Sequence, residues 1–401
     1  MTDAPARSGL SQWIDISREC LVHNIGEFRR LAGAKKKLMA VVKANAYGHG
    51  ILPTARIFSN SGADWLGVHS LEEGILLRKE GFTCPILVAG PIPLDGLKEA
   101  VAHDLRLTVY NFETLDPLSK ACGQLQKKAF LHVKVETGTY RQGIRDEEAL
   151  SFMKKAQEHS CLVLEGISSH FANIEDTTDH TYAQSQLQNF KRIVEELEKN
   201  KIEIPLKHMS CSASAILFPD TYFDMVRAGI GMYGLWPSKE TFLSCRLQKR
   251  DPLRLEPVLS WKTRIAQIKK VPKGSFIGYG CTYRVSRESV LAVLPIGYYD
   301  GYDRGLSNSS FVLIRGKRAP LRGRVAMDFI VVDITDIPRV KLEDEVVLLG
   351  KDGEEKITAD DLASLVGTIN YEIVTRINPL IPRIVIGVAS QHSTFSAFSF
   401  F

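Results

Sequence analysis

Residues 129–169 read AFLHVKVETGTYRQGIRDEEALSFMKKAQEHSCLVLEGISS. The stretch begins with AFLHVKV and ends with LVLEGISS, two apolar, β-branched runs that are typical of buried strands. Between them Leu150, Met153 and Ala156 recur at helical spacing, and acidic residues fill the first turn, where the helix dipole favours negative charge. The stretch therefore predicts a strand, a helix over 145–158 and a second strand, which is one unit of a parallel sheet.

The same alternation of strand and helix recurs through the first 235 residues. The eight predicted strands cover residues 38–43, 64–69, 85–89, 105–110, 129–135, 162–169, 204–209 and 225–230. The clearest helical face between them consists of Leu187, Phe190, Ile193, Val194 and Leu197. Eight such units predict a closed (β/α)8 barrel of the TIM type, because right-handed crossovers place every helix outside. The alternative is an open doubly wound sheet, which is expected to carry G-x-G-x-x-G after an early strand; none follows an early strand here.

The last third of the chain has a different pattern. Short β-rich runs such as SVLAVLPIGYY, FIVVDI and EVVLLG are separated by turns that contain Gly, Pro or Asp. One helical piece follows Thr358, which is expected to cap it together with Asp361, three residues further on. We therefore predict an α/β barrel domain over 12–245 and a mostly antiparallel β domain over 246–390, with the first strand, 12–17, a candidate to pair with the second domain.

Composition excludes several classes of protein. The chain has 401 residues, of which 44% are hydrophobic and 24% charged, values that exclude a disordered or collagen-like chain. The 51 basic and 46 acidic residues give a net charge of +5, and no basic block stands out, so a nucleic acid is not an expected partner. No apolar run approaches 18 residues and the start lacks the apolar core of a signal peptide, so no membrane association is expected.

The seven cysteines are odd in number, scattered and free of any C-x-x-C pair. This pattern is typical of a reduced intracellular protein without structural disulfides, so we expect a cytoplasmic location. Neither a cysteine cluster nor an H-x-x-x-H pair is present, so no metal is expected.

Lys43 is the first candidate for chemistry. In parallel barrels the active site lies at the carboxyl ends of the strands, and the first predicted strand ends at Lys43. A lysine that closes an apolar strand is partly desolvated, which lowers its pKa and makes its amine available for a Schiff base. The alternative is a strand-end lysine whose ammonium group extends to water.

The sequence around Lys43, AVVKANAYGHG, resembles the cofactor-lysine motif of the alanine racemase family, enzymes of fold type III that use pyridoxal 5′-phosphate (PLP). The resemblance covers about residues 12 to 388 and recurs, in order, in the segments KVETGTYRQGI, HMSCSAS, DMVRAGIGMYG, FIGYGCTYRV, LPIGYYDGYDR, GRVAMDF and TINYEIVTRI. This resemblance implies roles for individual residues of these segments.

Two residues are implied to be catalytic. Lys43 is expected to bind PLP as an internal aldimine and then to act as one acid/base group, with Tyr279 as the other on the opposite face of the α-carbon. In the family this tyrosine comes from the partner subunit, so a homodimer with shared active sites is expected. Tyrosine ordinarily titrates near pH 10, so Tyr279 needs cationic neighbours or an imidazole to act as a base near neutrality.

Further residues are implied to bind the cofactor or the substrate. Arg227 is expected to donate to the pyridine nitrogen and His170 to pack on the pyridine ring. The residues expected to contact the cofactor phosphate or to line its pocket are Tyr47, Ser212, Gly229, Ile230 and Tyr371. Arg141, Met327 and Tyr298 are expected to contact the substrate, and Lys134, a site of carbamylation in many members, to face Arg141.

The chain departs from the family pattern at several positions. Cys211 stands where the family usually has asparagine, and Leu380 where an arginine is common. Glu136, Thr139, Tyr140 and Gln142 differ from the family's loop after the fifth strand. An altered cofactor environment is expected at Cys211.

The resemblance implies an amino-acid racemase that interconverts L- and D-alanine by two-base proton transfer on a PLP aldimine and supplies D-alanine for peptidoglycan. One alternative is a racemase of the same fold with broader specificity, for serine or basic amino acids. A second is an ornithine-type PLP decarboxylase, which is expected to have an acidic residue where Arg227 stands. A third is a noncatalytic PLP-binding protein made of the barrel alone.

Overall fold

The computed structural model describes residues 7–248 and 253–387, which form two compact units. The barrel unit comprises residues 20–46 and the described part of 51–256. The β unit comprises residues 7–19, 47–50 and 257–387. The described residues among 246–256 therefore belong to the barrel unit, whereas the sequence pattern assigns them to the second domain. The last residues of that predicted domain, 388–390, lie outside the described residues.

The barrel unit contains one sheet of eight strands, in the order β8-β7-β6-β5-β4-β3-β2-β9, and every pair in it is parallel. The strands are β2 Lys37–Val41, β3 Trp65–Val68, β4 Ile86–Val88, β5 Arg106–Val109, β6 Ala129–Lys134, β7 Leu162–Ser168, β8 Leu206–His208 and β9 Met225–Ala228. All eight predicted strands are present, so the predicted barrel is confirmed.

One aspartate joins the two ends of this strand order. The Asp224 backbone N–H donates to the carbonyl of Lys207 on β8 (3.0 Å), and its carboxylate accepts from the Lys207 N–H (2.9 Å). The Asp224 carbonyl accepts from the N–H of Lys37 on β2 (2.9 Å). A side chain thus replaces a missing ladder rung between β8 and β9 and satisfies backbone groups that are otherwise unpaired.

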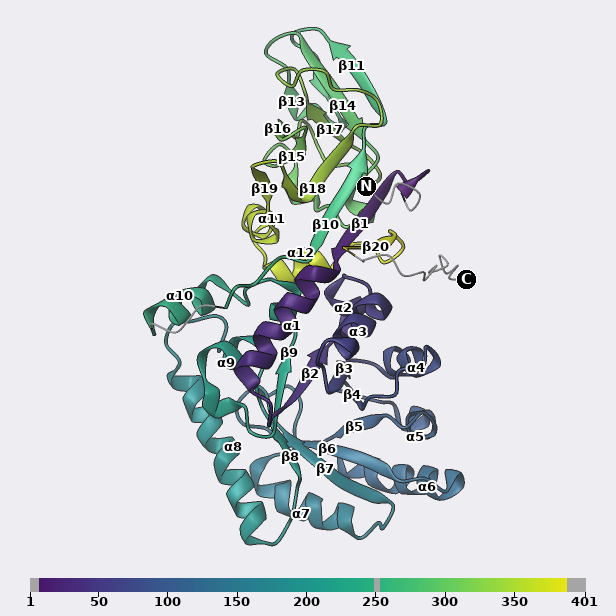
Figure 1. The fold of residues 1–401 in the computed structure, drawn as a ribbon, viewed down its shortest axis with the longest axis vertical. Helices are drawn as coiled ribbons and strands as arrows, with labels where there is room; N and C mark the ends of the chain where they lie inside the picture. Colours follow the sequence, from purple (N-terminus) through teal and green to yellow (C-terminus); the bar gives the residue numbers. More distant parts are fainter. Residues whose placement is uncertain (1–6, 249–252, 388–401) are drawn as a thin grey trace. The chain divides into compact units, whose positions relative to one another are not determined.

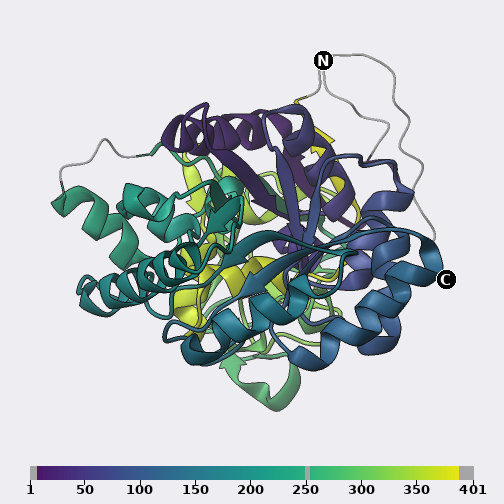
Figure 2. The ribbon, with the colours of Figure 1, turned by 90° about the horizontal axis from the view of Figure 1, so that it is seen from below.

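The helices of the barrel unit lie outside the ring of strands (Figures 1 and 2). They are α1 Arg18–Ala32, which begins in the β unit, α2 Lys43–Tyr47, which ends there, α3 Ile51–Asn60, α4 Leu71–Lys79, α5 Leu97–Ala102, α6 Leu115–Leu125, α7 Asp146–Gln157, α8 Thr181–Lys199, α9 Ser212–Leu217 and α10 Lys239–Leu247. The expected apolar face of α8 is buried throughout. On α7 the buried face includes Met153 and Ala156, as expected, but Phe152 takes the place of the half-buried Leu150.

The β unit is mostly antiparallel, as predicted. Its strands are β1 Gln12–Ser17, β10 Leu259–Arg264, β11 Gln267–Val271, β12 Phe276–Ile277, β13 Tyr283–Arg284, β14 Ser289–Leu294, β15 Phe311–Ile314, β16 Lys317–Pro320, β17 Ile330–Asp333, β18 Glu345–Asp352, β19 Glu355–Ile357 and β20 Arg383–Ile386. The larger sheet has the order β16-β15-β18-β10-β1-β20, with β19 on β18; a second has the order β11-β14-β17, and β12 pairs with β13.

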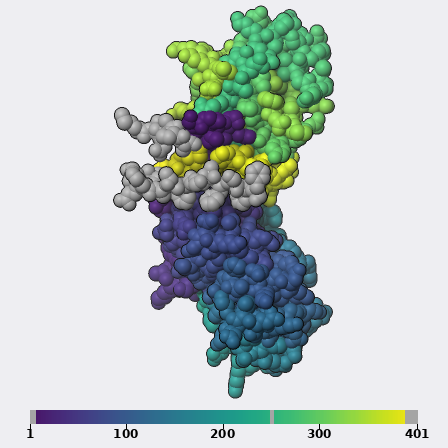
Figure 3. Space-filling model, turned by 90° about the vertical axis from the view of Figure 1, so that its right-hand side faces the viewer, coloured from purple at the N-terminus to yellow at the C-terminus, as the bar shows by residue number. Residues whose placement is uncertain are grey.

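The N-terminal strand β1 pairs with β10 in antiparallel and with β20 in parallel orientation. In Figure 3 these early residues, in purple, lie against green and yellow residues from the end of the chain. Two helices complete the unit, α11 Ala359–Val366 and α12 Asn370–Thr375. The predicted cap is confirmed, since the Thr358 side chain accepts from the Asp361 N–H and the Asp361 carboxylate accepts in return from Thr358.

Within residues 7–248 and 253–387, no helix has the length and apolar character needed to span a bilayer.

Candidate active site

The loop that carries Lys43 has an unusual backbone. The strand β2 ends at Val41, two residues earlier than the sequence predicts, and Lys43 begins α2. The four residues that follow Lys43, numbers 44–47, all have φ between 52° and 54°, in the left-handed region. That region costs non-glycine residues free energy, so a run of four persists only where the surroundings hold it.

Two side chains hold this left-handed turn. The Glu73 carboxylate accepts from the backbone N–H of Ala44 (2.7 Å) and, through its other oxygen, from the N–H of His69 (2.8 Å). The Asn45 side-chain oxygen accepts from the N–H of Ile51 at the start of α3 (2.9 Å). Sequence reasoning missed Glu73, although the S-x-x-E capping box from Ser70 at the start of α4 was a signal for its local role.

Several of the predicted site residues influence one another's charge. Burial lowers the pKa of Lys43, and the positive charges of Arg141 and Arg227 lower it further. Burial and the same two arginines lower the pKa of Lys134 to about 8. Burial, Arg227 and Lys134 hold the pKa of His170 well below its ordinary value, so its imidazole is neutral. The structure therefore brings these five residues together, in a region suited to an anionic ligand.

Lys134 has a partner that sequence reasoning missed. Its ammonium group donates to the Gln142 side-chain oxygen (3.2 Å), and the Gln142 amide donates to the Tyr110 hydroxyl (3.1 Å). Gln142 is one of the departures from the family pattern, and that departure was the available signal.

Arg227 is fixed by several hydrogen bonds. Its guanidinium donates to the carbonyls of Ser169 (2.8 Å), Met209 (3.0 Å) and Ser210 (3.1 Å), and a further nitrogen lies 3.0 Å from Nδ1 of His208. Burial lowers its pKa to about 10, so the group is still a cation at neutral pH. A guanidinium held in this way is a donor with a fixed direction.

Ser212, Gly229 and Ile230 also lie together, between the starts of α9 and of the turn after β9. The Ser212 hydroxyl accepts from the backbone N–H of Gly229 (2.9 Å) and of Gly231 (3.2 Å). Gly231 was missed: a Cβ there would lie 2.4 Å from the Phe28 ring, so only glycine fits. Beside them, burial and the charge of Glu175 raise the pKa of the Cys211 thiol to about 12, so it stays protonated.

In the β unit, Tyr47 and Tyr371 are brought together, with ring centroids 6.1 Å apart at an interplanar angle of 59°. Arg383, which sequence reasoning missed, donates to the carbonyl of Gly48 (3.0 Å) and to those of Ile377 (3.1 Å), Asn378 and Ile381 (both 2.6 Å). It thereby ties the segment after Tyr47 to the loop before β20.

The other predicted residues of the β unit lie on neighbouring turns. The Tyr298 N–H donates to the carbonyl of Ala326 (3.0 Å), next to Met327. Tyr279 begins a turn in which a Cβ on Gly280 would lie 2.8 Å from the Arg324 guanidinium. All three predicted side chains are exposed, Tyr279 most of all, at 75%. Leu380 is exposed as well.

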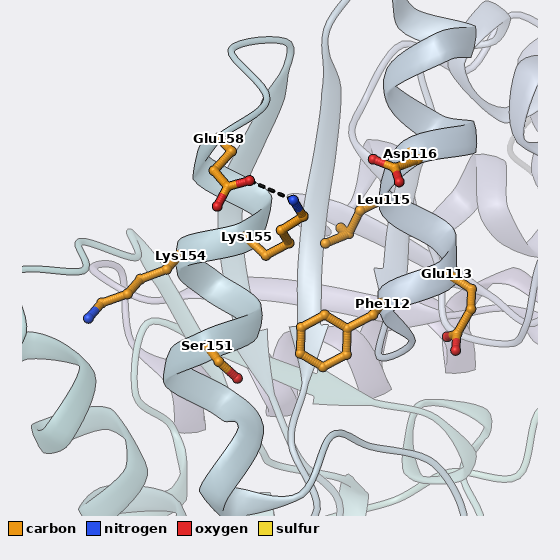
Figure 4. A pocket seen from close by; sticks show the side chains of 8 residues that line it. All are labelled: Phe112, Glu113, Leu115, Asp116, Ser151, Lys154, Lys155 and Glu158. Carbon is orange, nitrogen blue, oxygen red and sulfur yellow. Dashed lines mark hydrogen bonds and ion pairs between the residues drawn. The ribbon is translucent and has the colours of Figure 1, made fainter.

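An open pocket of about 590 Å³ lies elsewhere on the barrel unit, between α6 and α7. Phe112 lines the side formed by the start of α6, and on the α7 side Lys155 pairs with Glu158 (Figure 4). None of the predicted site residues lines it. Within the described ranges, no group of three or more histidine, cysteine, aspartate or glutamate side chains is arranged to hold a metal ion.

Comparisons with known proteins agree with this geometry. Residues 16–237 match the alanine racemase N-terminal domain family, and residues 258–385 match the alanine racemase C-terminal domain family. An alanine racemase of Halothermothrix orenii is 43% identical over 92% of this chain and 96% of its own. One of Methanococcus maripaludis is 41% identical over 93% of this chain and 98% of its own.

Solved structures give the same result. The alanine racemase of Clostridium difficile 630 is 34% identical, with a TM-score of 0.88 over 94% of this chain and 96% of its own. That of Bacillus anthracis, with bound L-Ala-P, is 36% identical, with a TM-score of 0.87 over 94% and 95%. Relatives of nearly full length thus share both the sequence and the fold, and the chain belongs to the alanine racemase family.

Proposed function

We propose that this protein interconverts L- and D-alanine with pyridoxal 5′-phosphate as its cofactor. The observation that carries the proposal is the environment of Lys43: its amine has a lowered pKa, follows a barrel strand and is held by a left-handed turn beside Arg141 and Arg227. A desolvated amine with cationic neighbours is the kind of nucleophile that binds a carbonyl compound covalently. The names of the relatives support alanine as the substrate.

The chemistry of the surrounding groups fits this cofactor. The Ser212 oxygen accepts two backbone N–H bonds, so its own proton is left to donate outwards, towards a phosphate oxygen. The glycine-rich backbone at Gly229 and Ile230 allows close approach of such an anion. Tyr47 and Tyr371, whose rings lie together in the β unit, are proposed to contact the cofactor as well. When bound, the cofactor supplies an aldehyde that captures amino groups and an electron sink that acidifies the α-proton.

Arg227 favours a racemase over an ornithine-type decarboxylase. Because a guanidinium keeps its proton near neutral pH, Arg227 would donate to the pyridine nitrogen of the bound cofactor, and that nitrogen would then stay unprotonated. A weaker electron sink limits side reactions that need a long-lived carbanion. The barrel-only alternative is disfavoured because residues 258–385 of the chain also match the alanine racemase C-terminal domain family.

Lys43 and Tyr279 are the proposed acid/base pair. Lys43 moves the proton on one face of the α-carbon, and Tyr279 moves it on the other. We propose that Tyr279 acts in the site of a second copy of the chain, within a homodimer. Its high exposure supports this, as does that of other large apolar side chains of the β unit, namely Tyr298, Met327, Ile369 and Leu380.

Substrate contacts are proposed for Arg141, which orients the carboxylate, and for Tyr298 and Met327, which line the entrance. Lys134 is proposed to be carbamylated, because its lowered pKa gives the neutral amine that reacts with carbon dioxide. The product D-alanine would then supply peptidoglycan in the cytoplasm. A reducing location is consistent with the seven cysteines, none of which is in a disulfide in the structure.

Borohydride reduction of the protein incubated with the cofactor tests the proposal. The pyridoxyl group should be found on the peptide that contains Lys43, and Lys43→Ala should remove the label. Labelling of another lysine in the wild type would refute the assignment. A panel of alanine, serine and lysine, scored for the opposite isomer, then tests substrate breadth: a preference for alanine supports the proposal, whereas faster turnover of serine or lysine favours the broader-specificity racemase.

A further inference from the structure

A line of polar side chains runs from Arg227 into the interior of the barrel. One guanidinium nitrogen of Arg227 lies 3.0 Å from Nδ1 of His208, and Nε2 of His208 lies 2.7 Å from Nδ1 of His132. Nε2 of His132 lies 3.2 Å from a carboxylate oxygen of Glu165, which also accepts from Nε of Arg106 at 3.3 Å. The line therefore joins side chains from four strands, β9, β8, β6 and β7, and ends on β5.

Only one set of tautomers satisfies these contacts. A guanidinium can only donate, so Nδ1 of His208 accepts and its Nε2 carries the proton. That proton is donated to Nδ1 of His132, whose Nε2–H in turn donates to the Glu165 carboxylate. Every hydrogen bond from Arg227 to Glu165 thus points in the same direction.

The charge states agree with this direction. Burial lowers the pKa of His132, and burial together with Arg227 holds the pKa of His208 well below its ordinary value, so both rings are neutral. Burial raises the pKa of Glu165, but its hydrogen bonds and charge interactions with His132 and Arg106 hold it below the ordinary value. The line of side chains therefore has one anion, Glu165, which lies between the neutral ring of His132 and the Arg106 guanidinium.

The barrel is shaped around this line. Both imidazoles are completely buried, and the His132 ring packs edge-on against Trp65, with centroids 5.3 Å apart. A Cβ on Gly166 of β7 would lie 2.3 Å from Nδ1 of His132, so glycine at this position makes room for the ring. A tightly packed ring keeps its hydrogen-bond direction, which a solvent-exposed histidine does not.

We propose that Glu165, His132 and His208 form a directed relay that positions Arg227 and sets how strongly its guanidinium donates to the pyridine nitrogen of the cofactor. The Glu165 charge strengthens each bond in the line, because hydrogen bonds in a chain polarise one another. His208 becomes a stronger acceptor, and Arg227 a weaker proton donor at its other end. The inference rests on the proposed function only where it names the cofactor nitrogen.

The charges that face the relay come from several strands. His132 is faced by Glu165, Arg106 and Arg227, and His208 by Arg227, His132 and Lys134. Removal of Arg106 and removal of the Glu165 charge are expected to change the strength of the His132–Glu165 hydrogen bond in opposite directions. Without it, Glu165 loses a competing donor and pulls the His132 proton more strongly; with Glu165→Gln, that pull is weakened.

Ring N–H resonances of histidine, recorded by NMR on protein without cofactor, test the relay itself. Glu165→Gln should shift both the His132 and the His208 signals upfield. Arg106→Gln should shift both signals downfield. Glu198→Gln is the matched control, since Glu198 pairs with Lys207 on the adjacent surface of β8 and should leave both signals in place. Shifts in the same direction, or an unmoved His208 signal, would overturn the proposal. If Glu165→Gln does not fold, Arg106→Gln alone decides by the sign at His208.

A second measurement uses the holoenzyme. The pH titration of the visible absorbance of the cofactor should move in Glu165→Gln, and kcat should change by roughly twofold to tenfold while KM stays within a factor of two, because the relay acts through Arg227. The control should change neither. An unmoved titration with shifted ring signals would overturn the role of the relay at Arg227. Absence of cofactor binding in the wild type would refute the proposed function instead.

Discussion

Lys134 shows how much a single side chain depends on its surroundings. Carbon dioxide reacts only with a neutral amine, and a lysine with a pKa of about 8 is about half neutral at pH 8, against well under about 1% for an ordinary lysine. With 13C-labelled carbon dioxide at constant concentration, we expect a carbamate signal whose initial rate of growth falls roughly fivefold from pH 8 to pH 7, because this rate follows the neutral fraction of the amine. NMR of the wild type measures it, and Lys134→Arg should lack it. A signal independent of pH would contradict the lowered pKa.

Gln142 adapts to either state of Lys134. It accepts from the ammonium through its oxygen and donates to Tyr110 through its nitrogen; rotation of the amide by half a turn would let it donate to a carbamate and accept from Tyr110. Gln142→Leu removes the side-chain amide that bonds to Lys134 and Tyr110 and is expected to reduce carbamate occupancy, measured by the same 13C signal. Gln142→Glu should reduce it further by holding the ammonium; an increase in either variant would contradict this role.

At this scale the sequence predicted Lys43, Arg227 and Ser212 because each lies in a motif. It did not predict the roles of His132 and Arg383, because His208 and Gly48, which they contact, are distant in sequence and meet them only after folding. Glu73 and Gln142 each had a local signal, but the bonds from Glu73 to the Lys43 turn and from Gln142 to Tyr110 join separate segments. Glu165, for instance, acts on Arg227 through two histidines from other strands.

At the scale of elements, the segment that follows the left-handed turn after Lys43 packs closely against the backbone of α12. Gly48 has φ +83°, and a Cβ there would lie 1.9 Å from the carbonyl oxygen of Val374 in α12. Gly48→Ala is therefore expected to destabilise the protein by at least about 2 kcal/mol. Gly81→Ala is the matched control: its φ is +81° with no atom within 4 Å, so it should cost only about 1 kcal/mol. Thermal unfolding compares the two, and equal losses would show that the backbone contact is not needed.

Glu73 connects α4 to the same turn. Glu73→Gln turns an amide nitrogen towards backbone N–H donors, so one of the bonds from Ala44 and His69 is lost. We expect a loss of about 1–3 kcal/mol in stability, together with faster release of the cofactor. Glu72→Gln, on the same turn of α4, should have little effect on either. Thermal unfolding and loss of cofactor absorbance on dilution measure both; indistinguishable variants would contradict the role of Glu73.

The apolar pattern predicted the position of every barrel strand but placed the end of β2 two residues too late. Apolar periodicity records burial, whereas the end of β2 is set by the left-handed turn, which depends on Glu73 and Asn45. The cap of α11 was predicted because a capping box is local in sequence.

In the whole molecule, sharing of active sites between subunits has a direct test. Lys43→Ala and Tyr279→Phe should each be nearly inactive alone. After unfolding and refolding as an equal mixture, half of the dimers combine both chains and each of these has one intact site, so about a quarter of the wild-type activity should return. Activity is measured as the rate of D-alanine formation. No recovery, with mixed dimers demonstrated by mass spectrometry, would contradict a shared site.

The change of pattern along the chain predicted two units, but it did not predict which residues belong to each unit. Residues 47–50 belong to the β unit although they follow the first barrel strand. The reason is physical: Gly48 packs against α12 and is bound by Arg383, and neither contact leaves a local trace in the sequence.

Racemisation is tested most directly by incubating L-alanine with the enzyme in deuterium oxide. Two-base proton transfer predicts that the α-carbon gains deuterium while optical rotation falls to zero, and that Tyr279→Phe slows proton removal from L-alanine more than from D-alanine. NMR of the α-position and polarimetry record both. Loss of rotation without deuterium, or release of carbon dioxide, would contradict the assignment of this protein as a racemase that uses Lys43 and Tyr279.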